Sequence, residues 1–293
     1  MSSSRENMSR REAMAAIGLM AMSCQRTLGG ESGSARRPQA RRGIALQLYT
    51  LREPAKRDLP GTLKKAREMG WEYVQWSGMP NLPAKAIREA LDTAGLKAVS
   101  AHIAVEPFEK DFDANVRFWK TVGVTHLAPG GMMRDCTGTL EAWLRGAKRL
   151  DALGAKLRAV GIRLAYHNHY FEFEKFPGDP RCKLDILFES TRPANLAAEF
   201  DTAWVYHGGA DPAAYIHKYK NRCPLIHVKD GINKEGGKFQ FKPLGQGALH
   251  WDDIFAAGRE SGVEWYVYEQ DGGEGSPFDY AQSCYEFLKK NVP

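Results

Sequence analysis

The sequence has 293 residues, of which 43% are hydrophobic and 26% are charged, so it is long and apolar enough to bury one large core. The net charge of +6 is concentrated at the start, where residues 1–42 contain eight arginines and three glutamates, which leaves +1 for residues 43–293. A nearly neutral remainder argues against a phosphate-backbone partner, so we expect no nucleic-acid binding.

Residues 1–24 are expected to form an export signal of the twin-arginine type. Ser9-Arg10-Arg11-Glu12 precedes the apolar run Ala13–Met22, the order of features in such signals. This run is too short to cross a bilayer as a helix, so we expect no transmembrane segment in the mature protein. Cys24 follows a segment that loosely resembles a lipoprotein cleavage site, and a lipid anchor there stays open. The alternative is an arginine-rich start with no targeting role.

Residues 25–43 are rich in Gly, Ser and Arg and are expected to be a disordered linker before a catalytic domain over residues 44–293. An export signal would place this domain in the periplasm or on the cell envelope. Four cysteines lie in the domain, namely Cys136, Cys182, Cys223 and Cys284. Their wide spacing fits neither a disulfide framework nor a zinc ribbon, so we expect mostly buried, unpaired side chains.

From residue 44 onward, short apolar and β-branched runs alternate with longer segments of helical period, the pattern of parallel βα units. The expected strands are Ile44–Tyr49, Tyr73–Trp76, Ala98–His102, His126–Ala128, Arg163–Asn168, Leu196–Phe200, Leu225–Val228 and Trp265–Glu269. The expected helices lie near 60–69, 83–94, 112–122, 139–160, 183–190, 211–219, 251–260 and 278–290. Eight such units in about 250 residues predict a single closed (β/α)8 TIM barrel.

Polar side chains stand at the ends of several of these strands, where TIM barrels carry their active sites. They are Gln47, His102, His167, His169, Asp201, His227 and Glu269. Singly buried charges would be costly, and a metal ion would compensate for them. Mixed imidazole and carboxylate ligands suit Mn, Zn, Co or Fe better than Ca or Mg, so we expect one divalent ion, with manganese preferred.

Six stretches make the chain resemble the sugar phosphate isomerase/epimerase family of xylose isomerase-like TIM barrels. They are Ile44–Tyr49, Tyr166–Phe173, Glu199–Trp204, His227–Asp230, Leu244–Gly247 with Trp251, and Val267–Asp271. The resemblance implies a metal ion held by Glu, Asp, His and Glu at successive strand ends. Asp201, His227 and Glu269 match the last three ligands. His167 stands in place of the first glutamate, and His169 competes with it as a ligand.

The resemblance implies activation of a C–H bond beside a carbonyl, because a metal ion on the carbonyl oxygen stabilises the resulting enolate. Proton-transfer candidates are Glu269, His169 and Glu172, the last if its loop folds back. Lys229 either stabilises the oxyanion or forms a structural pair with Asp230 or Glu199. We expect four residues to contact substrate: Gln47, Trp76, His102 and Trp204. Trp251 is expected to be structural, and because His250 replaces a usual capping Asp, Asp252 is expected to support the helix start.

The leading functional hypothesis is a metal-dependent isomerase or epimerase acting on a keto sugar or polyol. The change at His167 and the expected export leave open a lyase that eliminates the aglycone from 3-keto glycosides. A phosphodiesterase resembling endonuclease IV and a non-catalytic sugar-binding protein are further alternatives. The expected partner is a small carbohydrate, and the sequence leaves the oligomeric state open, a homo-oligomer included.

Overall fold

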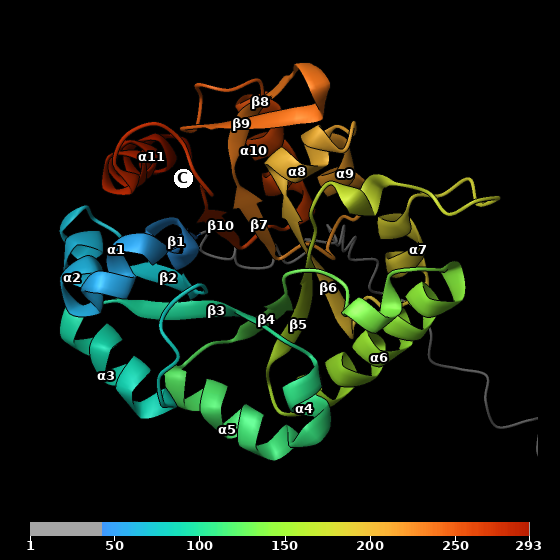
Figure 1. The fold of residues 1–293 in the computed structure, drawn as a ribbon, viewed down its shortest axis with the longest axis horizontal. Helices are drawn as coiled ribbons and strands as arrows, with labels where there is room; N and C mark the ends of the chain where they lie inside the picture. The colour runs from blue at the N-terminus through green and yellow to red at the C-terminus, as the bar shows by residue number, and fades with distance from the viewer. Residues whose placement is uncertain (1–42, 293) are drawn as a thin grey trace, which may run out of the picture. The chain divides into compact units, whose positions relative to one another are not determined.

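The structure is a computed structural model that describes residues 43–292, and these residues contain a closed barrel of eight parallel strands. The hydrogen-bonded order is β1-β10-β7-β6-β5-β4-β3-β2, and β1 closes the ring by pairing with both β10 and β2. The helices surround the strands (Figure 1). The expected TIM barrel is therefore confirmed. The predicted export signal, the possible anchor at Cys24 and the linker up to residue 42 lie outside the described residues.

All eight expected strands are present, with small shifts at their ends. The barrel strands are β1 (Gly43–Gln47), β2 (Tyr73–Trp76), β3 (Lys97–Ile103), β4 (His126–Pro129), β5 (Arg163–His167), β6 (Leu196–Asp201), β7 (Leu225–Val228) and β10 (Trp265–Tyr268). The expected helices are α2 (Leu59–Glu68), α3 (Ala84–Ala94), α5 (Phe112–Val122), α6 (Leu140–Ala159), α7 (Lys183–Glu189), α9 (Pro212–Lys218), α10 (Trp251–Ser261) and α11 (Pro277–Asn291).

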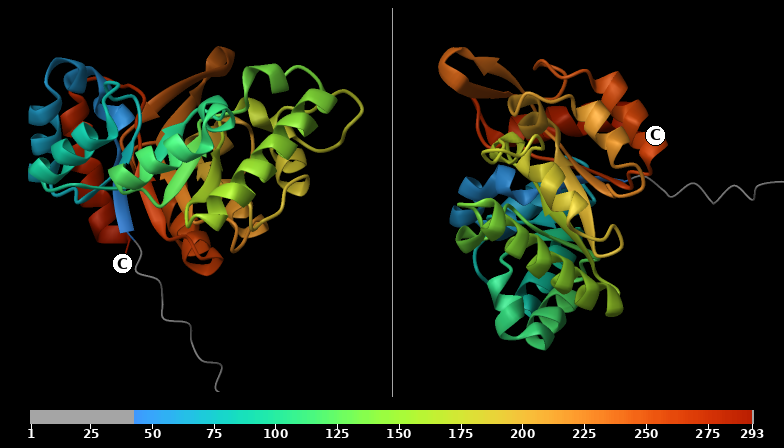
Figure 2. Two further views of the ribbon diagram at one scale, coloured as in Figure 1. Left: turned by 90° about the horizontal axis from the view of Figure 1, so that it is seen from below. Right: turned by 90° about the vertical axis from the view of Figure 1, so that its right-hand side faces the viewer.

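Further elements, which the sequence analysis did not predict, lie in the connections between these units. They are η2 (Leu48–Leu51), α1 (Arg52–Arg57), α4 (Glu106–Lys110), η3 (Arg134–Cys136), η4 (Phe171–Phe173), α8 (Thr202–His207), β8 (Asp230–Lys234), η5 (Glu235–Gly237) and β9 (Lys238–Lys242). β8 and β9 form an antiparallel hairpin directly after β7. This hairpin projects beyond the carboxyl ends of the barrel strands (Figure 2).

The barrel strands are buried on both faces, which explains their nearly continuous apolar sequences. Outward side chains such as Tyr166, Phe200 and Tyr266 belong to one hydrophobic cluster with Trp143 and Leu150 of α6. A second, smaller cluster consists of Ala45, Val99, Ala128, Ala165, Ala197, Leu225 and Val267. The side chains of this inner cluster fill the middle of the barrel interior, below the polar groups at the carboxyl ends of the strands.

Two of the turns from helix to strand depend on glycine. Gly95 and Gly262 follow α3 and α10 with φ of 71° and 81°, a left-handed conformation that ends a helix without a Cβ clash. Among residues 43–292, no helix is both long and apolar enough to cross a membrane. The four cysteines of this part of the chain are buried and unpaired, as expected.

Candidate metal centre and cavity

The four strands β5, β6, β7 and β10 place polar side chains in two successive tiers above the small apolar cluster. Side chains alternate along a strand, so residues two apart face the same side of the sheet. The lower tier consists of His167, Glu199, His227 and Glu269. The upper tier consists of His169, Asp201, Lys229 and Asp271, each two residues further along. The barrel therefore brings imidazoles, carboxylates and one ammonium into a single buried region.

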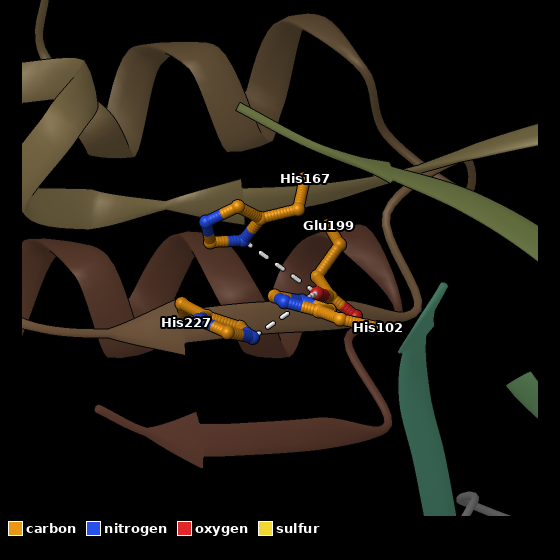
Figure 3. Close-up of side chains that lie close together, drawn as sticks. All are labelled: His102, His167, Glu199 and His227. Atoms are coloured by element: carbon orange, nitrogen blue, oxygen red, sulfur yellow. Dashed lines mark hydrogen bonds and ion pairs between the residues drawn. The ribbon is translucent and has the colours of Figure 1, made fainter. Parts of the chain in front are cut away.

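Glu199 lies at the centre of three imidazoles (Figure 3). Its Oε1 atom is 2.8 Å from His102 Nε2, 3.0 Å from His227 Nε2 and 3.6 Å from His167 Nδ1. The other oxygen, Oε2, accepts a hydrogen bond of 3.0 Å from Nε2 of Gln75. Because the Glu199 side chain is fully buried, its charge is compensated by these neighbours alone.

Lys229 lies among three carboxylates, one from the lower tier and two from the upper tier. Its Nζ atom is 2.7 Å from Glu269 Oε2, 3.0 Å from Asp201 Oδ2 and 3.1 Å from Asp271 Oδ2. Asp201 also caps α8, since its Oδ1 accepts a 3.0 Å hydrogen bond from the backbone N–H of Trp204. The ammonium therefore neutralises a site that would otherwise collect negative charge.

These contacts shift the pKa values of the buried groups. Burial alone would lower the pKa of His227, but the Glu199 carboxylate beside it raises that pKa to about 10. Burial would raise the pKa of Glu199, yet the charge of His227, the hydrogen bond with His102 and the nearby imidazole of His167 hold it well below its usual range. Burial would likewise raise the pKa of Glu269, and Lys229 keeps it low instead. Both glutamates are therefore ionised at neutral pH.

His169 is neutral at neutral pH, because burial, with help from the nearby Lys229 charge, lowers its pKa to about 4. Glu172 lies behind it: one oxygen accepts the backbone N–H of His169 at 2.9 Å, and the other accepts the hydroxyl of Tyr166 at 2.8 Å. Burial raises the pKa of this carboxyl to about 7. Glu172 is fully buried and positions His169, and it is not among the residues that line the cavity described next.

A cavity of about 440 Å³ opens above the lower tier. Its lining consists of Tyr49, Ser77, His102, Gly130, His167, His169, Trp204, Lys229, Phe241, Glu269 and Asp271. This volume is in the range of pockets that hold small ligands. Phe241 comes from the β8–β9 hairpin and packs edge-on against Trp204, so the hairpin contributes an aromatic wall.

The predicted site residues divide into those that reach this cavity and those that do not. His102, His167, His169, Trp204, Lys229 and Glu269 line it. Asp201 and His227 are fully buried, and with His167 and Glu269 they form a set whose ligand atoms all lie within 4.8 Å of one another. Gln47 is buried and hydrogen-bonds to Gln75. Trp76 lines a neighbouring cavity of about 230 Å³ instead, next to His102.

The predicted structural pairs of Lys229 are wrong. Asp230 is occupied elsewhere: its carboxylate accepts the backbone N–H groups of Gly245 and Gly247 and the indole N–H of Trp251, at 2.9, 3.2 and 2.8 Å. The Asp230 carboxylate therefore connects the segment after the hairpin to α10 through these hydrogen bonds. Trp251 is buried and structural, as expected, and α10 begins after His250 without a side-chain cap.

Three polar residues of the site were missed from the sequence, namely Gln75 of β2, Glu199 of β6 and Asp271 after β10. Two of them could have been found from the alternation of side chains along a strand. Glu199 shares a face with Asp201, and Asp271 shares one with Glu269. Gln75 lies inside an otherwise apolar strand and carries no such pair.

Comparison with known proteins agrees with this architecture. Residues 63–291 match the family model described as xylose isomerase-like TIM barrel. An inosose dehydratase of Lacticaseibacillus casei is 25% identical over 268 residues, covering 78% of this chain and 86% of the relative. A sugar phosphate isomerase/epimerase from Parabacteroides distasonis superposes with a TM-score of 0.72 at 19% identity, over 91% of this chain and 99% of that one. A crystal structure of the IOLI protein with a bound zinc atom superposes with a TM-score of 0.63 at 16% identity, over 85% and 97%.

A closed parallel barrel with a polar cavity at the carboxyl ends of its strands defines a TIM-barrel protein of the enzyme type. The chain belongs to the xylose isomerase-like TIM barrel family, as its sequence motifs predicted. Its buried His, Glu and Asp side chains form a cluster consistent with a divalent metal ion.

Proposed function

We propose that this protein is a metal-dependent lyase that removes a proton beside the carbonyl group of a keto sugar or keto polyol and then expels a substituent from the next carbon. The observation that carries the proposal is the placement of neutral His169, cationic Lys229 and ionised Glu269 around one cavity above a cluster able to hold a cation. Such a reaction needs a base, an oxyanion partner and a Lewis acid, and His169, Lys229 and a bound cation would supply them in that order.

The donor set fits a divalent cation. His167 Nδ1 is buried and makes no hydrogen bond among the described residues, and the nearest carboxylate oxygen, Oε1 of Glu199, lies 3.6 Å away. Three imidazoles and several carboxylates suit Zn, Mn, Co or Fe. When bound, such an ion would polarise the substrate carbonyl and stabilise the negative charge on its oxygen.

His169 is the base in this proposal. Its ring lines the cavity, and its neutral form can accept a proton. The C–H bond breaks, its electron pair forms the new double bond, and the bond to the leaving oxygen breaks. The imidazolium then returns the proton to that oxygen, because its low pKa makes it a strong acid. Lys229 stays charged and donates to the developing oxyanion.

One comparison, one feature implied by the family resemblance and one expectation from the sequence support elimination over simple epimerisation. The relative at 25% identity is named a dehydratase, an enzyme that eliminates water. His167 replaces the glutamate that the family's epimerases use as a first ligand, which removes one carboxylate from the proton-transfer pair. The export signal expected at residues 1–24 favours an unphosphorylated substrate, so a 3-keto glycoside is the substrate class we propose.

The test is aglycone release from a chromogenic 3-keto glycoside by the purified protein in the presence of Mn²⁺. We expect release in the wild type and a loss of at least about 100-fold in His169→Gln, given the usual contribution of a general base. His217→Gln is the matched control, because His217 lies on α9 and does not line the cavity. Interconversion of free ketoses without any aglycone release would replace the lyase by an epimerase.

A further inference from the structure

Two alternative sets of side chains in the barrel are close enough to bind one cation. The first, called the lower set, consists of His102, His167, Glu199 and His227 and contains no residue of the upper tier. The second, called the upper set after Asp201 of the upper tier, consists of His167, Asp201, His227 and Glu269. The upper set matches the positions that the family resemblance implies. We propose that the divalent cation binds to the lower set in this protein, an inference that rests on the proposed metal-dependent function.

The distances around Glu199 in the lower set are close to those of a four-coordinate site, and all four ligand atoms lie within 4.8 Å of one another. Metal–ligand bonds of about 2.0–2.1 Å with tetrahedral angles place ligand atoms about 3.3–3.4 Å apart. Glu199 Oε1 lies 2.8, 3.0 and 3.6 Å from the nearest nitrogen atoms of His102, His227 and His167. Shifts of a few tenths of an ångström would therefore open this cluster around a cation.

The two nitrogen atoms of His227 decide between the sets. Nε2 lies 3.0 Å from Oε1 of Glu199 in the lower set and 2.7 Å from Oε1 of Gln75, whereas Nδ1 lies 3.0 Å from Glu269. A cation on Nε2 would therefore take the place of the contact with Gln75. A metal-binding histidine commonly donates its second N–H to a carboxylate, which fixes its tautomer and orientation. With Nε2 on the cation, Nδ1–H donates to Glu269, and this carboxylate becomes a partner of the ligand instead of a ligand.

Lys229 already occupies the region between the carboxylates of the upper set. Its ammonium is 3.0 Å from Asp201 and 2.7 Å from Glu269, so a cation bound there would lie next to an existing positive charge. Like charges at such distances repel strongly away from bulk water. The lower set offers one carboxylate and three imidazoles, with Lys229 outside it.

This assignment changes the role of His102, which the sequence predicted to contact substrate. Its Nε2 points at Glu199, and its ring lies parallel to that of His227 with centroids 5.2 Å apart. Both His102 and His167 line the cavity, so a cation in the lower set would be reached by substrate from above. Asp201, by contrast, is left as the helix cap of α8 and a counter-ion of Lys229.

The experiment measures metal binding itself. The full-length protein is stripped with a chelator, and binding of Zn²⁺ and Co²⁺ is followed by equilibrium dialysis and by the visible absorption of Co²⁺. We expect one ion per wild-type chain and at least 100-fold weaker binding in Glu199→Gln and His102→Ala. Asp201→Asn is the variant that discriminates between the two sets, and it should keep its affinity within about threefold if the cation binds to the lower set. Circular dichroism of the metal-free variants checks folding, and His102→Ala, which alters a partly exposed side chain, secures the test if Glu199→Gln fails to fold.

A 100-fold loss in Asp201→Asn, or wild-type affinity in His102→Ala, would overturn the lower set while leaving a metal enzyme intact. Failure of the wild type to bind any divalent ion would instead remove the proposed function. The two failures are therefore distinguishable in one set of titrations.

Discussion

The Nζ atom of Lys229 lies 2.7 Å from Oε2 of Glu269, deep in a barrel where neither side chain is appreciably exposed. Asp201 and Asp271 complete the surroundings of the same ammonium at 3.0 and 3.1 Å. One cation thus compensates part of the charge of three carboxylates. Burial would lower the pKa of Lys229, but Asp201 and Glu269 raise it, so the ammonium stays charged throughout the neutral range.

Lys229→Met should therefore destabilise the protein. Removing one partner of a buried ion pair leaves uncompensated charge and costs about 3–5 kcal/mol. Urea denaturation at neutral pH in the presence of a chelator measures this loss. Lys234→Met, on the exposed part of the β8–β9 hairpin, is the control and should change the free energy of unfolding by less than about 0.5 kcal/mol. Equal stability of the two variants would show that the three carboxylates do not depend on Lys229.

Glu172→Gln should impair turnover by displacing His169. The single carbonyl oxygen of glutamine can accept from the Tyr166 hydroxyl or from the His169 N–H, and its amide group then faces the other donor. An unsatisfied buried donor costs about 1–3 kcal/mol. Under the proposed function, we expect kcat for aglycone release to fall about tenfold with little change in KM.

Tyr166→Phe separates this positioning effect from stability. It removes the hydroxyl donor but leaves the Glu172 carboxylate bonded to the His169 N–H. The variant should lose stability and keep its kcat. A parallel loss of kcat in both variants would mean that Glu172 acts through general packing and not by orienting His169.

The fold could be predicted because each barrel strand carries a short apolar run followed by a helical period, and both signals are local. The hairpin Asp230–Lys242 and α8 (Thr202–His207) were missed for the opposite reason. They are short insertions between a strand and the next expected helix, too short to show a helical or strand period. Phe239 and Phe241 become informative only when they pack against Trp204.

The site was predictable only in outline. Strand alternation predicts that His167 and His169 face the same side of the sheet, as do Glu199 and Asp201. The stagger of neighbouring strands, however, decides which residues share a tier. His167 pairs in register with Glu199, whereas Asp201 pairs with His227, and this register is not visible in a single sequence. The contact of His102 with Glu199 joins residues 97 positions apart, so it too required the closed barrel.

Gly154→Ala should test the close approach of α6 to the segment before β6. A Cβ at this position would overlap the backbone carbonyl oxygen of Asn195, and backbone cannot move aside as a flexible side chain can. We expect a loss of about 1–3 kcal/mol, the usual cost of overpacking. Gly138→Ala is the matched control, because its Cβ would meet no heavy atom within 4 Å. Thermal unfolding followed by circular dichroism compares the two, and equal melting temperatures would contradict the predicted contact.

His126 should make the stability of the barrel depend on pH. It is buried in β4 and contacts the Thr125 hydroxyl through Nδ1 at 2.9 Å, and burial lowers its pKa from 6.5 to about 4. The unfolded chain takes up a proton near pH 6.5 while the folded chain stays neutral. Folding is therefore favoured above pH 6.5, and this part of the stability is lost as the pH falls from 6.5 towards 4.

The His126→Gln variant isolates this contribution, because position 126 no longer titrates in either state. One pKa unit corresponds to about 1.4 kcal/mol, so the wild type should lose about 2 kcal/mol between pH 7.5 and pH 5.0 that the variant does not lose. His167 and His169 titrate in both proteins and cancel in the difference. Urea denaturation at the two pH values gives the four free energies required. A wild-type minus variant difference that stays constant with pH would mean that His126 accepts a proton equally well in the folded barrel.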